Sequence, residues 1–333
     1  MKITVKEISR IFEERISGQE ETKKKLAAAV AMHYQMLEHN KKSANTPGYV
    51  KKHMGSILLY GPSGSGKTEF FRALRDSLGI PVIIWDTTSI TASGYKGDNL
   101  TDLLVSYYGT YKDDADSGIF IFDEFDKVCD LAHSDTQSGE YARSFLNEFL
   151  KLVEGKEFDT HDTGDILMVM TGSFGKLVNE KKTPVTEKVM GFGSAVVPEE
   201  KQKSMLTNKD FIQYGITPEL MGRISVICNV DPLTKDALKS ILLQKTTSPI
   251  KGYQEVFAES GNELKFTNTA IDYIVDESMK YGLGARGLQK VLTPYMLDVV
   301  YETDGMKNIR LSVTGRDMQN RNVPRIQKRR KIV

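Results

Sequence analysis

The chain has 333 residues, of which 40% are hydrophobic and 27% charged, which is an ordinary composition for a soluble globular protein. This length suffices for two hydrophobic cores, and a formal net charge of only +1 gives no general attraction to nucleic acid or membranes. Its two cysteines, Cys129 and Cys228, exclude a disulfide framework and a cysteine zinc site. No apolar run reaches the roughly 18 residues of a membrane span. We therefore expect a cytoplasmic protein of two domains.

Short apolar runs rich in β-branched residues recur along the first two thirds of the chain, with helical stretches between them. They are residues 56–60, 81–86, 118–123, 165–170 and 224–230. Strands that are apolar on both faces and separated by helices are typical of a parallel sheet covered on both sides. The sequence thus predicts an α/β large domain over residues 1–230.

The pattern changes after residue 230. Three segments have the spacing of amphipathic helices, 235–245, 268–280 and 284–301. Residues 309–313 favour one strand. We expect a smaller, mostly helical domain over 232–314. Residues 315–333 have a net charge of +6, whereas the rest of the chain has a net charge of −5, and we expect them to form a basic, disordered tail.

Residues 56–74, SILLYGPSGSGKTEFFRAL, predict a strand, a glycine-rich turn and a helix. The turn has the spacing GxxxxGK[ST], in which glycines let backbone N–H groups converge on phosphate oxygens at a helix N-terminus. Lys67 is expected to reach the β and γ phosphates of a bound nucleotide, and Thr68 to bind Mg²⁺. The predicted nucleotide-binding residues of this loop are Gly61, Pro62, Ser63, Gly64, Ser65, Gly66, Lys67 and Thr68.

The run GIFIFDEFDK, residues 118–127, supplies the acidic complement of that loop. Four apolar residues carry the chain through the sheet and bring Asp123 and Glu124 to its carboxyl edge. Asp123 is suited to hold the magnesium ion, and Glu124 to polarise an attacking water. Together with the glycine-rich loop, this pair predicts a nucleoside triphosphatase.

Seven motifs in this order resemble those of the ClpX-type AAA+ protein unfoldases, a family of hexameric rings related to HslU. They are ISGQE (16–20), GPSGSGKT (61–68), GYKG (94–97), IFDEFDK (121–127), MGFGSA (190–195), YGITPELMGRI (214–224) and GARGL (284–288). The likeness extends to about residue 314. It implies a P-loop AAA+ large domain with a parallel sheet, followed by a small helical lid domain.

The resemblance implies roles for five further residues around the nucleotide. Thr171 corresponds to sensor 1, a polar group near the γ-phosphate. Arg223 corresponds to the arginine finger, which reaches the nucleotide of the neighbouring subunit, and Arg286 to sensor 2. Ile16 and Ser17 fall where the family packs the adenine, with Ser17 in place of an apolar residue.

Two loops of the family contact other proteins, and both have counterparts here. In the family, the loop after the second strand faces the axial channel, so Tyr95 is expected to grip the translocating polypeptide. Lys96 stands where ClpX usually has an aliphatic residue. Six such lysines around one pore would favour acidic segments of substrate. Met190, Gly191 and Phe192 stand where ClpX docks on the ClpP peptidase.

The resemblance implies an ATP-driven homohexamer that unfolds polypeptides with ATP and Mg²⁺ and feeds a ClpP-type peptidase. The N-terminal zinc-binding domain of ClpX is expected to be absent. Two alternatives stay open: a stand-alone remodelling chaperone without a peptidase, and a nucleic-acid-associated AAA+ protein that uses the basic tail. Nucleic acid and membranes are not the expected partners. A scaffold that binds ATP without hydrolysis is disfavoured by Glu124 and Arg223.

Overall fold

The computed structural model describes residues 3–89, 100–158, 161–182, 206–243 and 247–328. The chain divides into two units that alternate along the sequence. The first unit contains the first three residues, residues 28–61 and residues 78–229. The second contains residues 4–27, 62–77 and 230–333. The long helix α2 (Glu20–Ser43) and the helix α3 (Glu69–Leu78) each pass from one unit to the other.

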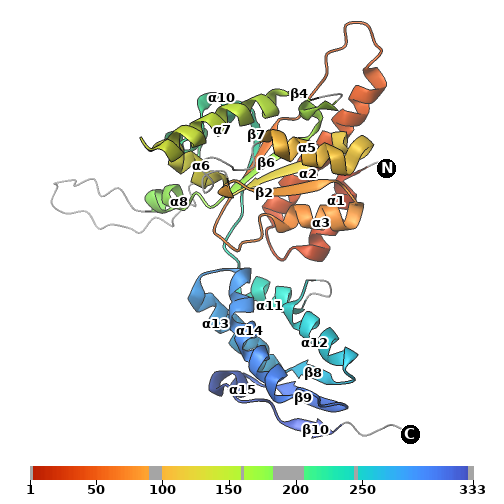
Figure 1. Cartoon of the computed structure of the whole chain (residues 1–333), viewed down its shortest axis with the longest axis vertical. Helices are drawn as coiled ribbons and strands as arrows, with labels where there is room; N and C mark the ends of the chain where they lie inside the picture. The colour runs from red at the N-terminus through yellow and green to blue at the C-terminus, as the bar shows by residue number, and fades with distance from the viewer. Residues whose placement is uncertain (1–2, 90–99, 159–160, 183–205, 244–246, 329–333) are drawn as a thin grey trace, which may run out of the picture. The chain divides into compact units, whose positions relative to one another are not determined.

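The first unit is built on a parallel sheet of five strands in the order β2-β3-β6-β1-β7. Figure 1 labels β2, β6 and β7 of this sheet, which lie among the helices of the unit. The strands are β1 (Ser56–Tyr60), β2 (Val82–Asp86), β3 (Ile119–Asp123), β6 (Leu167–Gly172) and β7 (Ile224–Asn229). Each overlaps one of the five apolar runs, with bounds that differ by at most two residues. The predicted parallel α/β sheet is therefore confirmed.

Helices, two 3-10 turns and one short antiparallel strand pair (β4 and β5) connect these strands among the described residues. They are α5 (Leu100–Tyr111), η1 (Lys112–Ser117), α6 (Phe125–Ala132), α7 (Gln137–Glu154), β4 (Glu157–Phe158), β5 (His161–Asp162), η2 (Thr163–Asp165), α8 (Gly175–Lys182), α9 (Asn208–Tyr214) and α10 (Pro218–Met221). Phe122 of β3 packs edge-on against Phe149 of α7, with ring centroids 4.6 Å apart. The alternate residue Ile121 is equally buried. Because successive side chains of a strand point to opposite faces, both faces of the sheet are covered.

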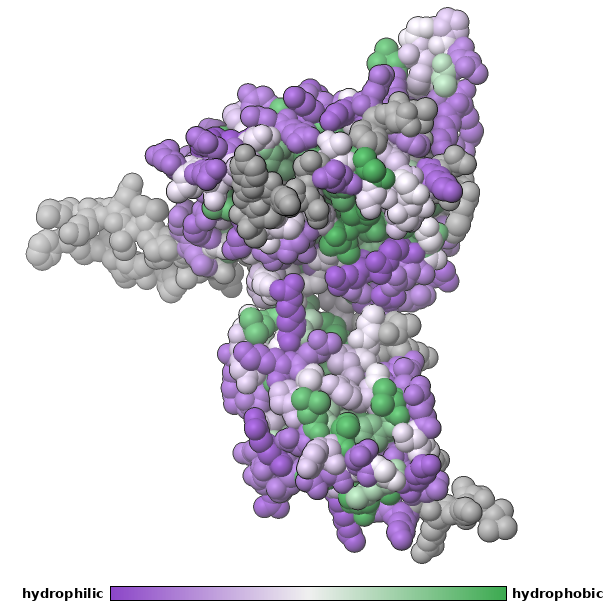
Figure 2. Space-filling model, viewed as in Figure 1, coloured by the Kyte–Doolittle hydropathy of each residue, from purple (hydrophilic) through white to green (hydrophobic). Residues whose placement is uncertain are grey.

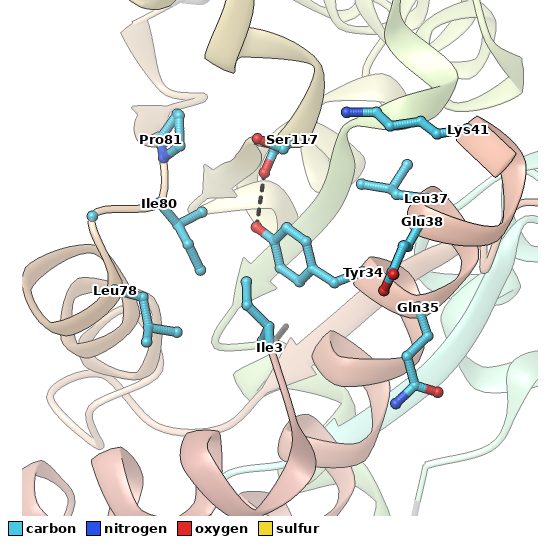
Figure 3. Close-up of a pocket in the computed structure, with 11 residues that line it drawn as sticks. Ile3, Tyr34, Gln35, Leu37, Glu38, Lys41, Leu78, Ile80, Pro81 and Ser117 are labelled. Atoms are coloured by element: carbon cyan, nitrogen blue, oxygen red, sulfur yellow. Dashed lines mark hydrogen bonds between the residues drawn. The ribbon is translucent and has the colours of Figure 1, made fainter. Parts of the chain in front are cut away.

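A hollow of about 560 Å³ opens at the amino edge of this sheet (Figure 3). Leu78–Pro81, which lead into β2, and Ser117, just before β3, line it together with residues of α2. The Tyr34 hydroxyl donates a hydrogen bond of 2.8 Å to the Ser117 carbonyl across it. The hollow thus lies at the opposite edge from Asp123, which ends β3.

The second unit combines helices with a sheet of three strands. Its elements are α1 (Val5–Arg15), α11 (Lys235–Leu243), α12 (Pro249–Glu259), β8 (Glu263–Phe266), α13 (Asn268–Tyr281), α14 (Ala285–Glu302), β9 (Ile309–Val313), α15 (Gly315–Asn320) and β10 (Ile326–Lys328), with the first part of α2 and most of α3. The helices predicted from residues 235–245, 268–280 and 284–301 are α11, α13 and α14, and the predicted strand is β9. The strand order is β10-β9-β8.

The expectation of a disordered tail is wrong for the segment from Gly315 to Lys328. Thr314 and Asp317 form a capping box that starts α15, and Met318 is buried in the core of the second unit. Strand β10 then pairs antiparallel with β9. A capping box and one buried methionine are short local signals of a helix. The prediction of disorder gave more weight to the high positive charge of the segment.

Among the described residues, no helix has the length and apolar character needed to cross a membrane.

Candidate active site

The glycine-rich loop follows β1 and leads into α3, as the sequence predicts. Gly64 and Gly66 have positive φ angles of 73° and 95°, a conformation that side chains with a Cβ rarely adopt. The Ser65 residue is buried, and its hydroxyl has no hydrogen-bond partner in the described part of the chain. A buried hydroxyl without a partner is costly, so the loop suits a ligand that carries hydrogen-bonding oxygens.

The lysine of the loop is folded back over it. Lys67 is only 8% exposed, and its Nζ donates a hydrogen bond of 3.0 Å to the Pro62 carbonyl. Thr68 is the last residue before α3, and its carbonyl accepts from the Arg72 N–H at 3.2 Å. The ammonium group therefore lies within the loop, and the threonine hydroxyl stands at a helix N-terminus, where anions are favoured.

Asp123 and Thr171 meet at the carboxyl edge of the sheet of the first unit. They end neighbouring strands, because β3 pairs with β6 and Phe122 lies opposite Met170. The Thr171 hydroxyl donates a hydrogen bond of 2.5 Å to Asp123 Oδ1. The same oxygen accepts from the Glu124 backbone N–H at 3.0 Å. The structure thus brings together three of the predicted site residues, although no pattern in the sequence joined Thr171 to the acidic pair.

Glu124 has a left-handed backbone, with φ 57° and ψ 29°, and α6 begins immediately after it. A residue with a Cβ rarely adopts this conformation, and such residues concentrate at functional sites. The turn is fixed from the other side by Thr87, whose N–H and hydroxyl donate to the Asp123 carbonyl at 3.0 and 2.8 Å. The backbone around the acidic pair is therefore held in place on both sides of the strand end.

Asp126 is a buried acidic residue of this region for which no sequence pattern indicated a role. Its Oδ2 accepts hydrogen bonds from the Ser173 hydroxyl at 2.7 Å and from the Phe174 N–H at 3.1 Å. Burial and, after it, the charge of Asp126 raise the pKa of the Cys129 thiol. Cys129 is therefore a buried neutral thiol and not a nucleophile. Asp126 lies in the motif IFDEFDK, and this position next to the acidic pair was the only indication of a role that the sequence offered.

Arg286 lies against the glycine-rich loop within the second unit. Its Nη1 donates a hydrogen bond of 3.0 Å to the Ser63 hydroxyl, and the neighbouring Ala285 N–H donates to the Gly64 carbonyl at 3.0 Å. A Cβ placed on Gly284 would lie 2.4 Å from the Gly64 carbonyl oxygen. The first glycine of the GARGL motif therefore permits a direct backbone contact that brings the start of α14 to this loop.

The predicted adenine residues lie in the connection between α1 and α2. Ile16 and Ser17 are both buried, and the Ser17 hydroxyl lies 3.1 Å from the Ser240 hydroxyl. The Gln19 side chain exchanges two hydrogen bonds with the Asp231 backbone, of 2.7 and 2.9 Å. The polar Ser17, where the family has an apolar residue, thus contacts another hydroxyl of the second unit.

Arg223 lies apart from the cluster around Asp123. It connects α10 to β7, and its carbonyl accepts from the Ser56 N–H at 2.9 Å. Its guanidinium donates to Glu154 Oε1 at 2.7 Å, and the two side chains are 54% and 41% exposed. The backbone of Arg223 is therefore anchored to the sheet, while its charged group stands on the surface.

The remaining predicted contacts fall outside the described residues. These are Tyr95, Lys96, Met190, Gly191 and Phe192. Among the residues that are described, no group of three or more His, Cys, Asp and Glu side chains is placed to hold a metal ion. The magnesium prediction does not need such a group, because Mg²⁺ in phosphate-transfer sites is bound through one or two protein oxygens and the phosphates themselves.

Comparisons with known proteins agree with this geometry. Residues 52–227 match the family model described as AAA domain (Cdc48 subfamily), and residues 233–305 match that of the C-terminal, D2-small domain of ClpB protein. The ATP-dependent Clp protease ATP-binding subunit ClpX of Borrelia duttonii (strain Ly) is 30% identical, over 94% of this chain and 78% of its own length. The subunit of the same name from Porphyromonas gingivalis (strain W83) is 26% identical, over 89% and 76%. The chain therefore belongs to the ClpX-type AAA+ proteins and is an ATPase.

Proposed function

We propose that this protein is an ATP-dependent protein unfoldase and translocase that works as a homohexameric ring and delivers polypeptide to a ClpP-type peptidase. The observation that carries the proposal is the joining of Asp123, Glu124 and Thr171 at one edge of the sheet. The likeness to subunits of the ATP-dependent Clp protease, which extends over 94% and 89% of this chain, supports the remainder.

The residues present fit ATP and a magnesium ion. The Thr68 hydroxyl and the Asp123 carboxylate are hard oxygen donors of the kind that Mg²⁺ prefers. The partnerless Ser65 hydroxyl and the buried Lys67 ammonium suit phosphate oxygens. When bound, the metal ion neutralises charge on the β and γ phosphates.

The chain's own residues then carry out the hydrolysis. Glu124 takes the proton of the attacking water, as a carboxylate positioned next to the Asp123 strand end can do. Thr171 donates the single proton of its hydroxyl to Asp123, and so acts on the γ-phosphate by positioning this carboxylate. Arg286, which lies on the Ser63 hydroxyl, stabilises phosphate charge from the side of α14. These roles are those that the family resemblance implies for the same positions.

Two surface features support assembly into a ring. The Arg223 guanidinium is exposed, which suits a group that acts on the nucleotide of a neighbouring subunit. The second unit also has apolar surface among its polar side chains (Figure 2). On α14, Leu297 is 63% and Tyr301 82% exposed, with Val300 beside them. Exposed apolar patches of this kind mark protein–protein contacts.

We assign substrate gripping and peptidase docking to the two loops that the family resemblance identified, one with Tyr95 and Lys96 and one with residues 190–192. Tyr95 offers a large contact area with little preference for the sequence that it touches, and Lys96 adds a positive charge. Met190 and Phe192 provide the apolar side chains for a peptidase cleft. We infer that the first loop grips substrate inside the ring and that the second docks on the peptidase.

A trap experiment tests the proposal. The protein is incubated with ATP, a folded reporter and a ClpP-type peptidase, in parallel with a Glu124→Gln variant that holds substrate without turnover. Degradation that needs ATP, this protein and the peptidase together is the expected result. Unfolding of the reporter without any effect of the peptidase would favour the stand-alone chaperone. An unchanged reporter in the presence of rapid ATP hydrolysis would contradict the unfoldase assignment.

A further inference from the structure

Asp126 connects the start of α6 with the chain that leaves β6. It lies two residues after Glu124 and is only 1% exposed. Its Oδ2 binds the Ser173 hydroxyl and the Phe174 N–H, while its Oδ1 has no hydrogen-bond partner among the described residues. Burying a carboxylate with one oxygen unsatisfied is costly, so a residue that served packing alone would be apolar.

The contact belongs to a double link between the ends of β3 and β6. On one side of Gly172, the Thr171 hydroxyl binds Asp123. On the other side, Ser173 and Phe174 bind Asp126. A Cβ placed on Gly172 would lie 2.8 Å from Asp126 Oδ1, so the strand end lies directly against the carboxylate.

This arrangement restricts the movement of the two groups that act on the nucleotide. Glu124 is attached to α6 through one peptide bond, and Thr171 is separated from Ser173 by Gly172 alone. A displacement of the segment after β6 relative to α6 would break both hydrogen bonds to Asp126. Catalytic groups must be held to within a fraction of an ångström, because small misplacements cost large factors in rate.

We propose that Asp126 is a positioning residue for ATP hydrolysis. It holds Ser173 and Phe174, which follow β6, against the first turn of α6. It thereby keeps the Thr171 hydroxyl and the Glu124 carboxylate in a constant relation. The inference rests on the roles proposed above for these two residues. Because Asp126 is buried and binds Ser173 and Phe174, it acts through these neighbours.

Three variants test the inference in the full-length protein with ATP and magnesium. Asp126→Ala removes the acceptor, Asp126→Asn keeps an acceptor oxygen without the charge, and Ser173→Ala removes one donor. Hydrogen bonds to charged groups are strong enough that we expect kcat to fall about 10-fold or more in Asp126→Ala and about 3-fold in Ser173→Ala. We expect nucleotide affinity to change less than about 3-fold, since the phosphate loop is untouched. Asp126→Asn should recover most of the lost kcat.

Tyr107→Phe is the matched control. It removes a buried hydrogen bond, from the Tyr107 hydroxyl to the Ala115 carbonyl, in the same core but at the amino edge of the sheet, opposite the carboxyl ends of β3 and β6. It should lower the melting temperature and leave kcat unchanged. An Asp126→Ala variant that melts earlier but keeps the wild-type kcat would overturn the proposal, as would an Asp126→Asn variant as slow as Asp126→Ala.

Two further results separate this inference from the proposed function. If Asp126→Ala does not fold, the kcat of Ser173→Ala decides, and a wild-type value there overturns the inference. Glu124→Gln is measured alongside, and full turnover in that variant would remove the proposed hydrolytic role of Glu124. An inactive Glu124→Gln together with a fully active Ser173→Ala would remove the role of Asp126 alone.

Discussion

The Arg223 guanidinium donates a hydrogen bond of 2.7 Å to the Glu154 carboxylate on the surface of the first unit. Both side chains are well exposed, so the ion pair itself contributes at most about 1 kcal/mol to stability. An arginine held this loosely can exchange its partner for a stronger one. This exchange is what an arginine finger needs when a neighbouring subunit presents its nucleotide.

For Arg223→Ala we therefore expect ATP still to bind while turnover is lost. Removal of such a finger can lower kcat by about 10³-fold or more. The matched control is Glu154→Gln, which removes the charge of the Arg223 partner and should leave turnover and nucleotide binding nearly unchanged. Steady-state ATPase assays with a binding titration measure both effects. Full activity of Arg223→Ala would refute the assignment.

Glu124→Gln should keep nucleotide binding and abolish hydrolysis, because the amide cannot accept the proton of the water. A general base contributes typically about 10²- to 10⁴-fold to a rate. The exposed Glu140 on α7 provides the control, since Glu140→Gln makes the same chemical change on another helix, in a side chain that is exposed to solvent. The measurements are single-turnover hydrolysis and binding of a fluorescent ATP analogue. Equal rates in the two variants would contradict the assignment.

Met318→Ala should destabilise the second unit, because Met318 is buried in its core. Truncation of a buried methionine to alanine costs about 2–5 kcal/mol. The neighbouring Gln319 is exposed, so Gln319→Ala serves as control with a change within about 0.5 kcal/mol. Urea unfolding followed by circular dichroism gives both values. Similar stabilities for the two variants would mean that α15 does not belong to this core.

The free energy of unfolding should decrease at low pH because His33 is protonated more readily in the unfolded chain than in the folded protein. Burial, and after it the charge of His53, lowers the pKa of His33 from 6.5 to about 4 in the folded protein. The folded state therefore keeps His33 neutral while the unfolded chain takes up a proton below pH 6.5. The contribution to stability is complete above about pH 6.5 and decreases toward pH 4, with roughly 2 kcal/mol lost by pH 5.

Unfolding free energies at pH 7.5 and pH 5 check this expectation. In His33→Phe the difference between the two free energies should shrink by about 2 kcal/mol. His39 is exposed, so His39→Phe should keep the full difference. An unaltered pH dependence in His33→Phe would show that other groups are responsible.

Tyr95→Ala should leave ATP hydrolysis largely intact and abolish unfolding of a stable tagged substrate, because the motor then lacks traction. Lys96→Val should weaken engagement of an acidic tail more than that of a neutral one. This difference should decrease with added salt, because charges are screened over about 8–10 Å at physiological ionic strength. One folded reporter carrying either tail measures both effects. Normal unfolding by Tyr95→Ala would remove the assignment of this loop to the pore.

The three central strands β3, β6 and β1 could be predicted from the sequence, because a strand buried on both faces is apolar along nearly its whole length. The edge strands β2 and β7 are partly exposed, and their β-branched residues indicated them instead. The glycine-rich loop and the acidic pair were equally predictable, since phosphate binding requires particular residue types at a set spacing. In contrast, α15 and β10 were predicted to be disordered, because the charge of the tail outweighed one capping box and one buried methionine in the local pattern.

The sequence by itself determined which chemical groups the site contains: the loop from Gly61 to Thr68 and the carboxylates of Asp123 and Glu124. Only the tertiary structure decided how those groups are held. The hydrogen bond of Thr171 to Asp123 and the burial of Asp126 against Ser173 join residues 47 or 48 positions apart. Neighbouring strands bring such residues together through their hydrogen-bond register, and this register depends on the packing of the whole sheet.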